Sequence, residues 1–385
     1  MMVKLKECTI GELCNTISDT YKGNDEYVVL VNTSDVLDGK ILNHSVVENK
    51  NLKGQFKKTF KKNDILYSEI RPANKRFAFI DFEDTDNYIA STKLMVLRHN
   101  DNVLPEFLFA LLKSNYIISE LQHLAETRSG TFPQITFSSE LAPMKVKLPD
   151  KQTQQKIVSV LSSIEYKIDV NEKINNNLEQ QAQAIYKQMF IDNASSDWTE
   201  GTLSEIADIT MGQSPSGSSY NEDTNGIIFF QGRSEFGFRF PTVRLYTTEP
   251  KRMACANDTL MSVRAPVGDL NVAHTDCCIG RGLAAIHSKD NHQAFVLYTM
   301  FSLKKQLDVF NGEGTVFGSI NRNSLNEMPL LIPSSEKLDE FEVLVAPMDA
   351  AIRNNYDEIC RLEKLRDSLL PKLMSGELDV SELDL

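Results

Sequence analysis

Apolar side chains recur at alternating steps of four and three residues in two long stretches of this chain, and the second stretch repeats the first. This spacing is typical of a long helix with one apolar stripe, so we predict helices over residues 150–193 and 334–376. Because such a stripe needs a partner, we expect the two helices to pack on each other. The predicted seam consists of Ile157, Leu161, Ile164, Ile168, Asn175, Leu178 and Ile185 in the first helix, and of Phe341, Val345, Met348, Ile352, Asn355, Leu362 and Leu369 in the second.

Polar residues interrupt both ladders near the middle of each helix, where Asn175 and Asn355 stand. If the helices run antiparallel about a central twofold axis, these two side chains face each other. A buried asparagine pair lowers stability but fixes the register of the helices. In the alternative interpretation, the asparagines turn toward solvent and Ile174 takes the place in the seam.

The segments that precede the two helices also resemble each other. Residues 63–68 resemble residues 257–262, and each helix follows a proline and a good N-cap residue, Asp150 or Ser334. We therefore predict an α+β fold in which two tandem mixed α/β domains are separated by an antiparallel pair of long coiled-coil helices, as a pseudo-twofold internal repeat. The expected segments are 1–149 (first domain), 150–193 (central helix), 194–333 (second domain), 334–376 (distal helix) and 377–385 (acidic tail).

Charge is distributed unevenly along the 385 residues, whose formal net charge is -12. Residues 1–149 hold 19 basic and 19 acidic side chains, whereas residues 334–385 hold 6 basic and 13 acidic ones. The acidity therefore lies mainly in the distal helix and the tail. Because local patches set the attraction to phosphate, the two mixed domains can still carry basic faces.

The sequence shows neither a membrane segment nor a catalytic motif. No run of 18 apolar residues occurs and no apolar signal core follows the first residues, so we expect a cytoplasmic protein without a membrane partner. The six cysteines form no Cys-x-x-Cys pair, and we expect them to be reduced. Metal-binding His-Glu-x-x-His, nucleophilic Gly-x-Ser-x-Gly and P-loop patterns are missing from the sequence. We predict no catalytic residues, no metal site and no cofactor of its own.

Basic residues are densest in the first domain, where phenylalanines are interleaved with them. Cations among aromatic side chains favour a surface that faces DNA phosphates. The alternative is an edge strand that its lysines protect from aggregation. The candidates here are Lys53, Lys57, Lys58, Lys61, Arg71, Lys75 and Arg76.

The second domain offers a small polar loop and arginines in place of the lysines. Serine and glutamine side chains suit phosphates and base edges, and arginine reads guanine with two hydrogen bonds. A flexible turn and ordinary surface arginines are the alternative. Two matched turns, 128–133 and 312–318, are candidates for duplicated binding loops. The candidates are Gln213, Ser214, Ser216, Arg233, Arg239 and Arg264, with Arg128 and Thr315 from the matched turns.

Four stretches resemble the specificity subunit of type I restriction–modification systems. Residues 154–165 and 365–377 are similar to the start of that family's central helix and to the end of its distal helix. Residues 212–216 resemble its Gly-x-Thr/Ser-Pro-Ser turn, and residues 257–268 resemble a strand and turn of its target recognition domains. The first half departs from this pattern, because it lacks the Ser-Pro turn and has Glu-Ile-Arg-Pro at residues 69–72.

The resemblance implies a DNA-reading subunit that catalyses nothing. Each mixed domain would read one half of a bipartite target in double-stranded DNA, and the helices would set the spacing of the halves. Two modification subunits, which methylate adenine with S-adenosylmethionine, would dock on the helices. Restriction and translocase subunits, with ATP and magnesium, would complete the assembly. The alternatives are a helical protein-binding scaffold without DNA recognition, and a nuclease or methyltransferase with unrecognised motifs.

Overall fold

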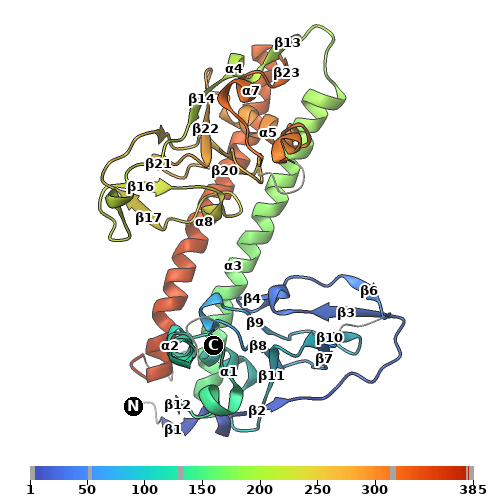
Figure 1. The fold of residues 1–385 in the computed structure, drawn as a ribbon, viewed down its shortest axis with the longest axis vertical. Coiled ribbons are helices and arrows are strands. Elements are labelled where there is room, and N and C mark those ends of the chain that lie inside the picture. Colours follow the sequence, from blue (N-terminus) through green and yellow to red (C-terminus); the bar gives the residue numbers. More distant parts are fainter. Residues whose placement is uncertain (1–4, 51–53, 129–132, 313–317, 379, 381–385) are drawn as a thin grey trace. The chain divides into compact units, whose positions relative to one another are not determined.

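The computed structural model describes residues 5–50, 54–128, 133–312, 318–378 and residue 380 (Figure 1). The chain divides into two compact units. Unit 1 comprises Met1–Asp169 and Ile359–Leu385, and unit 2 comprises Val170–Glu358. Each unit therefore joins one mixed segment to one half of each long helix.

The two long helices occupy the predicted stretches. α3 (Lys151–Tyr186) continues into a π-helical segment, η5 (Lys187–Asp192), and α8 spans Ser335–Ser375. Asp150 caps the start of α3, since its carboxylate accepts a hydrogen bond from the Thr153 amide at 2.9 Å. These hydrogen bonds hold the pKa of Asp150 below its ordinary value. Among the described residues, no helix is both long and apolar enough to cross a membrane.

Among its described residues, unit 1 contains two four-stranded sheets and two two-stranded ones, of which β4 (Val36–Leu37) and β5 (Lys40–Ile41) form the smaller. β1 (Lys6–Thr9) pairs antiparallel with β12 (Lys145–Leu148) just before α3. One sheet has the order β2 (Cys14–Ile17), β11 (Leu94–His99), β8 (Ile65–Ser68) and β9 (Phe77–Phe79). The other has the order β6 (Val46–Glu48), β3 (Tyr27–Val31), β10 (Tyr88–Ser91) and β7 (Phe56–Lys58), with β3 and β10 parallel. The remaining elements are η1 (Ile10–Glu12), η2 (Thr33–Asp35), η3 (Pro72–Asn74), α1 (Pro105–Leu112), α2 (Asn115–Arg128) and η4 (Phe137–Leu141).

Unit 2 repeats this plan with its own strands. β13 (Thr199–Thr202) pairs antiparallel with β23 (Pro329–Ile332) just before α8. One sheet has the order β14 (Ala207–Met211), β22 (Leu283–Ser288), β19 (Thr259–Ser262) and β20 (Leu270–Val272). The other has the order β15 (Tyr220–Asn221), β17 (Leu245–Thr247), β16 (Ile227–Phe230), β21 (Cys277–Ile279) and β18 (Met253–Ala254), with β16 and β21 parallel. The helical elements are α4 (Leu203–Ile206), η6 (Gly217–Ser219), η7 (Arg233–Glu235), α5 (Gln293–Ser302), α6 (Lys304–Leu307), η8 (Asp308–Asn311) and α7 (Arg322–Asn326).

The repeat extends to individual hydrogen bonds in the turns that precede β8 and β19. Asn63 and Asn257 both adopt a left-handed backbone, with φ of 68° and 74°, which asparagine tolerates better than most residues. The aspartates that follow are both buried, and each accepts a bond from the amide three residues earlier. The bond is 2.9 Å for Asp64 and 2.8 Å for Asp258. The same local chemistry therefore starts the central strands β8 and β19.

Ladder residues from both long helices join the core of each unit. In unit 1, Ile157 and Leu161 of α3 share a cluster with Leu370 and Leu373 of α8. In unit 2, Phe190 contacts Phe341 of α8 edge to face, with ring centroids 5.2 Å apart. Eight of the predicted seam residues are buried: Ile157, Leu161, Ile164, Ile168, Asn175, Phe341, Val345 and Ile352. Leu178, Ile185, Met348, Asn355, Leu362 and Leu369 are partly buried.

The polar residues of the two ladders fix the register of the helices inside unit 2. Asn355 donates a hydrogen bond of 2.9 Å from its Nδ2 to Oδ1 of Asn175, which is only 3% exposed. Asn171, which is 1% exposed, donates to Glu358 at 2.7 Å. Earlier positions of α3 thus pair with later positions of α8, so the helices are antiparallel here. The predicted Asn175–Asn355 pair is confirmed, and the alternative is wrong because Ile174 is 43% exposed.

The seam predicts a cost for removing one of its side chains. Leu161→Ala should lower the free energy of unfolding by about 2–5 kcal/mol, because it leaves a cavity among packed apolar side chains. Urea denaturation followed by circular dichroism measures this. Ser162→Ala, at an exposed neighbouring position of the same helix, is the matched control and should change little. Equal stabilities of the two variants would contradict the buried seam.

The asparagine pair makes a second prediction. Asn355→Ala should cost about 1–3 kcal/mol, because it leaves the buried Asn175 side chain without this partner. In a double-mutant cycle with Asn175→Ala, the two changes should be coupled by about 0.5 kcal/mol or more. Strictly additive effects on the unfolding free energy would show that the two amides do not interact.

Candidate nucleic-acid interface

Some lysines of the basic strand and loop in the first domain are exposed, and another forms a hydrogen bond to the protein backbone. Lys57 on β7 and Lys61 after it are exposed. Lys58 is half-buried, and its ammonium donates to the carbonyl of Leu94 at 2.8 Å. Burial lowers the pKa of Lys58. Of the candidate lysines in this strand and loop, Lys57 and Lys61 are therefore the exposed ones among the described residues, while Lys53 lies outside them.

The turn after β8 holds two residues in an unfavourable backbone conformation. Arg71 and Lys75 flank η3 with φ of 45° and 51°, a left-handed region that non-glycine residues seldom adopt and that recurs at functional sites. Arg71 is exposed and Lys75 is partly exposed. Arg76 instead donates to the carbonyls of Ser34 and Val36 at 3.1 and 3.2 Å, so it ties this turn to a neighbouring loop.

Backbone bonds join this turn to the segment that follows the predicted binding turn. The amide of Arg71 donates to the carbonyl of Pro133 at 3.1 Å, and Ile70 forms a β-bridge with Gln134. Arg128, at the end of α2, is half-exposed and pairs with Glu140 at 3.0 Å. The structure thus brings the exposed Arg71 next to the segment that follows the first of the two matched turns.

The second domain contains the equivalent junction. Arg264 is exposed and forms a β-bridge with Ser319, as Ile70 does with Gln134. The next amide, of Ala265, donates to the carbonyl of Gly318 at 3.0 Å. Thr315, in the second matched turn, lies outside the described residues. Arg71 and Arg264 therefore occupy corresponding turns of the two domains, after β8 and β19 respectively.

The polar loop of the second domain lies against a short glycine-containing segment. A Cβ at Gly212 would come within 2.1 Å of the carbonyl oxygen of Gly280, so only glycine permits this approach. The hydroxyl of Ser214 accepts a bond from the amide of Arg281 at 3.3 Å. Gln213 and Ser216 are exposed beside it, and so is Arg281. Arg281 is not among the candidates predicted from the sequence, because nothing local distinguishes it from the other arginines of this domain.

The structure contradicts one candidate and weakens another. Arg239 is only 4% exposed, and it pairs with Glu179 and Asp349 at 3.0 Å each. Such a guanidinium cannot reach DNA, so Arg239 as a base reader is a wrong prediction. Arg233 is 53% exposed, but it forms an ion pair of 2.6 Å with Asp269.

Two segments of the chain, residues 2–180 and 195–347, match the family described as the type I restriction modification DNA specificity domain. The chain belongs to this family. It is 31% identical to the type I restriction enzyme HindI specificity subunit of Haemophilus influenzae, over 97% of this chain and 99% of that protein. It is 26% identical to the type I restriction enzyme MjaIX specificity subunit of Methanocaldococcus jannaschii, over 74% and 71% of the two chains.

The fold is also found in a solved structure, the S subunit of a type I restriction–modification system from M. genitalium. That chain is 16% identical, the match covers 98% of this chain and 97% of that one, and the TM-score is 0.56. The family resemblance and the fold class drawn from the sequence are confirmed. The comparisons give no support to the alternative of a helical scaffold without DNA recognition.

Proposed function

We propose that this chain is the non-catalytic DNA-reading subunit of a type I restriction–modification complex, and that each mixed domain reads one half of a bipartite target in double-stranded DNA. The observation that carries this proposal is the duplication itself. Two domains that share the order of one four-stranded sheet and have corresponding turns each match a DNA specificity domain. Two readers of one design with different loop residues suit a target made of two different halves.

We propose that the reading surfaces lie around the corresponding turns. Arg71 and Arg264 are the central residues, because both are exposed in the corresponding turns after β8 and β19, where Arg264 aligns with Ile70 and Arg71 with Ala265. Arginine can bind guanine bidentately or pair with phosphate. Around them we assign further DNA contacts to Lys57, Lys61, Lys75 and Arg128 in the first domain, and to Gln213, Ser214, Ser216, Arg233 and Arg281 in the second. Lys58 and Arg76 support the surface through backbone carbonyls.

We further propose that α3 and α8 set the spacing between the two half-sites and carry two modification subunits. Those partners would bind S-adenosylmethionine and methylate adenine, and restriction subunits would bring ATP and magnesium for translocation and cleavage. The work takes place in the cytoplasm, where host DNA is accessible. Within the described residues, no group of three or more metal-ligand side chains could hold an ion.

Single-molecule sequencing of modified adenine in host DNA, with and without the gene, tests the proposed function. We expect a split motif, two short defined blocks around an unspecified gap, that vanishes on deletion. Replacing residues 198–333 by the second domain of a relative should change only one block. Methylation that is independent of the gene, in a strain whose modification subunits are active, would contradict the proposal.

The location of Arg71 and Arg264 in corresponding turns of the two domains predicts separable effects. Arg71→Ala should relax the first block and Arg264→Ala the second, because each loses contacts in its own half. Loss of one bidentate base contact corresponds to about 1–3 kcal/mol of discrimination. Methylated motifs in each variant strain give the readout. Lys147→Ala, at an exposed position of β12, is the control and should leave both blocks intact. Relaxation of the opposite block would show that the reading surfaces are assigned wrongly.

A further inference from the structure

The second domain packs on α8 through apolar residues such as Phe341, whose ring contacts that of Tyr298, and also through a set of polar contacts. The side chains that make the polar contacts stand at other positions of α8 than the apolar ladder. Asp339 pairs with His292 at 2.9 Å, and Glu342 accepts the amide of Phe295 at 3.0 Å. Further along the helix, Arg353 donates to the carbonyl of His274 at 2.7 Å, and Asp357 pairs with the His274 ring at 2.8 Å.

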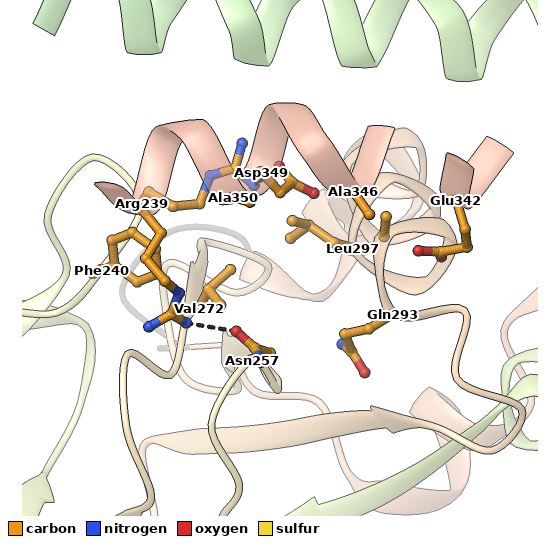
Figure 2. A pocket seen from close by; sticks show the side chains of 12 residues that line it. Arg239, Phe240, Asn257, Val272, Gln293, Leu297, Glu342, Ala346, Asp349 and Ala350 are labelled. Atoms are coloured by element: carbon orange, nitrogen blue, oxygen red, sulfur yellow. Dashed lines mark hydrogen bonds and ion pairs between the residues drawn. The ribbon is translucent and has the colours of Figure 1, made fainter. Parts of the chain in front are cut away.

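Apolar packing leaves a gap at this junction. A hollow of about 370 Å³ separates α8 from the domain. Figure 2 shows Ala346 and Ala350 on the helix side and Val272 and Gln293 on the domain side. Small helix side chains next to an open volume make few close contacts, and close contacts are what hold packed groups in one position. At this place the polar contacts therefore supplement the apolar packing in setting the angle of the domain on α8.

Arg239 is the most deeply buried of these contacts and joins three elements. Its Nη1 lies 3.0 Å from Oδ1 of Asp349 on α8, and its Nη2 lies 3.0 Å from Oε2 of Glu179 on α3. Nη2 also donates to the hydroxyl of Tyr298 on α5 at 3.2 Å, and that hydroxyl donates to Asp349 at 2.8 Å. A planar guanidinium with fixed donor directions holds its acceptors in a defined geometry, which an ammonium does not.

The corresponding junction in unit 1 uses the same helix position with a different cation. Asp349 and Glu165 occupy the same position in the repeat, since each directly follows a seam residue, Met348 or Ile164. Glu165 pairs with Lys113 at the end of α1. Asp169, one turn further along α3, pairs with Lys40 of β5 at 2.6 Å. An acidic helix position thus recurs in both halves, whereas the buried arginine fork between two helices belongs to the second domain.

We propose that Arg239 is a positioning residue that fixes the orientation of the second recognition domain on α3 and α8, and thereby restricts the DNA spacer length that the protein accepts. This inference rests on the proposed function. One added base pair moves a half-site by about 3.4 Å along the DNA and turns it by about 35°, so a domain that could shift and turn by these amounts would match a spacer longer or shorter by one pair. Arg239 prevents this displacement without contacting DNA.

The test compares three variants in the assembled complex, with duplexes whose half-sites are kept and whose spacer is native or changed by one base pair. Arg239→Lys keeps the charge but loses the fork. The triple variant Arg239→Met, Glu179→Gln and Asp349→Asn removes both ion pairs of Arg239 without leaving an unpaired charge. Tyr298→Phe removes a single hydroxyl and keeps the ring that fills the core. Lys337→Ala is the control, because its ion pair with Glu340 lies within α8.

We expect the affinity ratio between native and altered spacers to fall by about tenfold in the first two variants, and less in Tyr298→Phe. The methylated motif in vivo should keep both blocks but occur with more than one gap length. Lys337→Ala should keep the wild-type ratio. A purely stabilising role would lower the amount of folded complex and leave the gap length unchanged.

Three results would overturn the inference. The first is an unchanged affinity ratio between native and altered spacers in the variants that fold; if the other variants do not accumulate, Tyr298→Phe decides. The second is an altered sequence of the second block. The third is an equal loss of binding at every spacer length. Failure of the proposed function is distinguishable, because the wild-type chain would then give no split motif at all. A wild-type split motif with an unaltered gap in the variants rejects the positioning role alone.

Discussion

A long helix with a single apolar stripe is not stable in water by itself, and the architecture of this chain depends on how that stripe is covered. α3 has 36 residues and α8 has 41. In each unit, one half of each helix buries its ladder together with the core of the adjoining mixed segment. Because the stripe becomes part of the domain core, neither long helix can be displaced without exposing the core of a domain.

The antiparallel register follows from polar groups rather than from apolar ones. Leucine, isoleucine and valine rungs tolerate sliding, since one apolar side chain can replace another of similar size. Asn175 and Asn355 do not, because a shift by one turn would leave both amides buried against apolar neighbours. A buried amide without a hydrogen-bond partner costs more free energy than a formed amide–amide hydrogen bond contributes. The pair therefore stabilises little by itself and acts by destabilising every other register.

How much the sequence could predict depends on whether the signal was local. The helix ladders, the N-cap at Asp150 and the asparagine pair follow from spacing and from the repeat, so they could be predicted. The buried state of Arg239 could not, because Asp349 lies 110 residues away and only tertiary packing brings the two together. Arg76 is a similar case, since its acceptors are backbone carbonyls of another loop. The alignment of residues 69–72 with residues 263–266 follows from the sequence repeat, and the equivalent β-bridges of Ile70 and Arg264 agree with it.

The acidic net charge of this chain has a structural explanation that is compatible with DNA binding. A DNA-binding protein with net charge -12 would repel phosphate if its carboxylates lay beside the reading surface. Several of them instead lie on α8 and contact the second domain: Asp349 forms an ion pair with Arg239, and Asp339 and Asp357 contact the rings of His292 and His274. The paired charges of Asp349 and Arg239 produce a short-ranged field, and salt screens exposed carboxylates that are distant from the reading surface. The acidic residues of α8 thus help to position the domain, and the exposed Arg71 and Arg264 remain available to attract DNA.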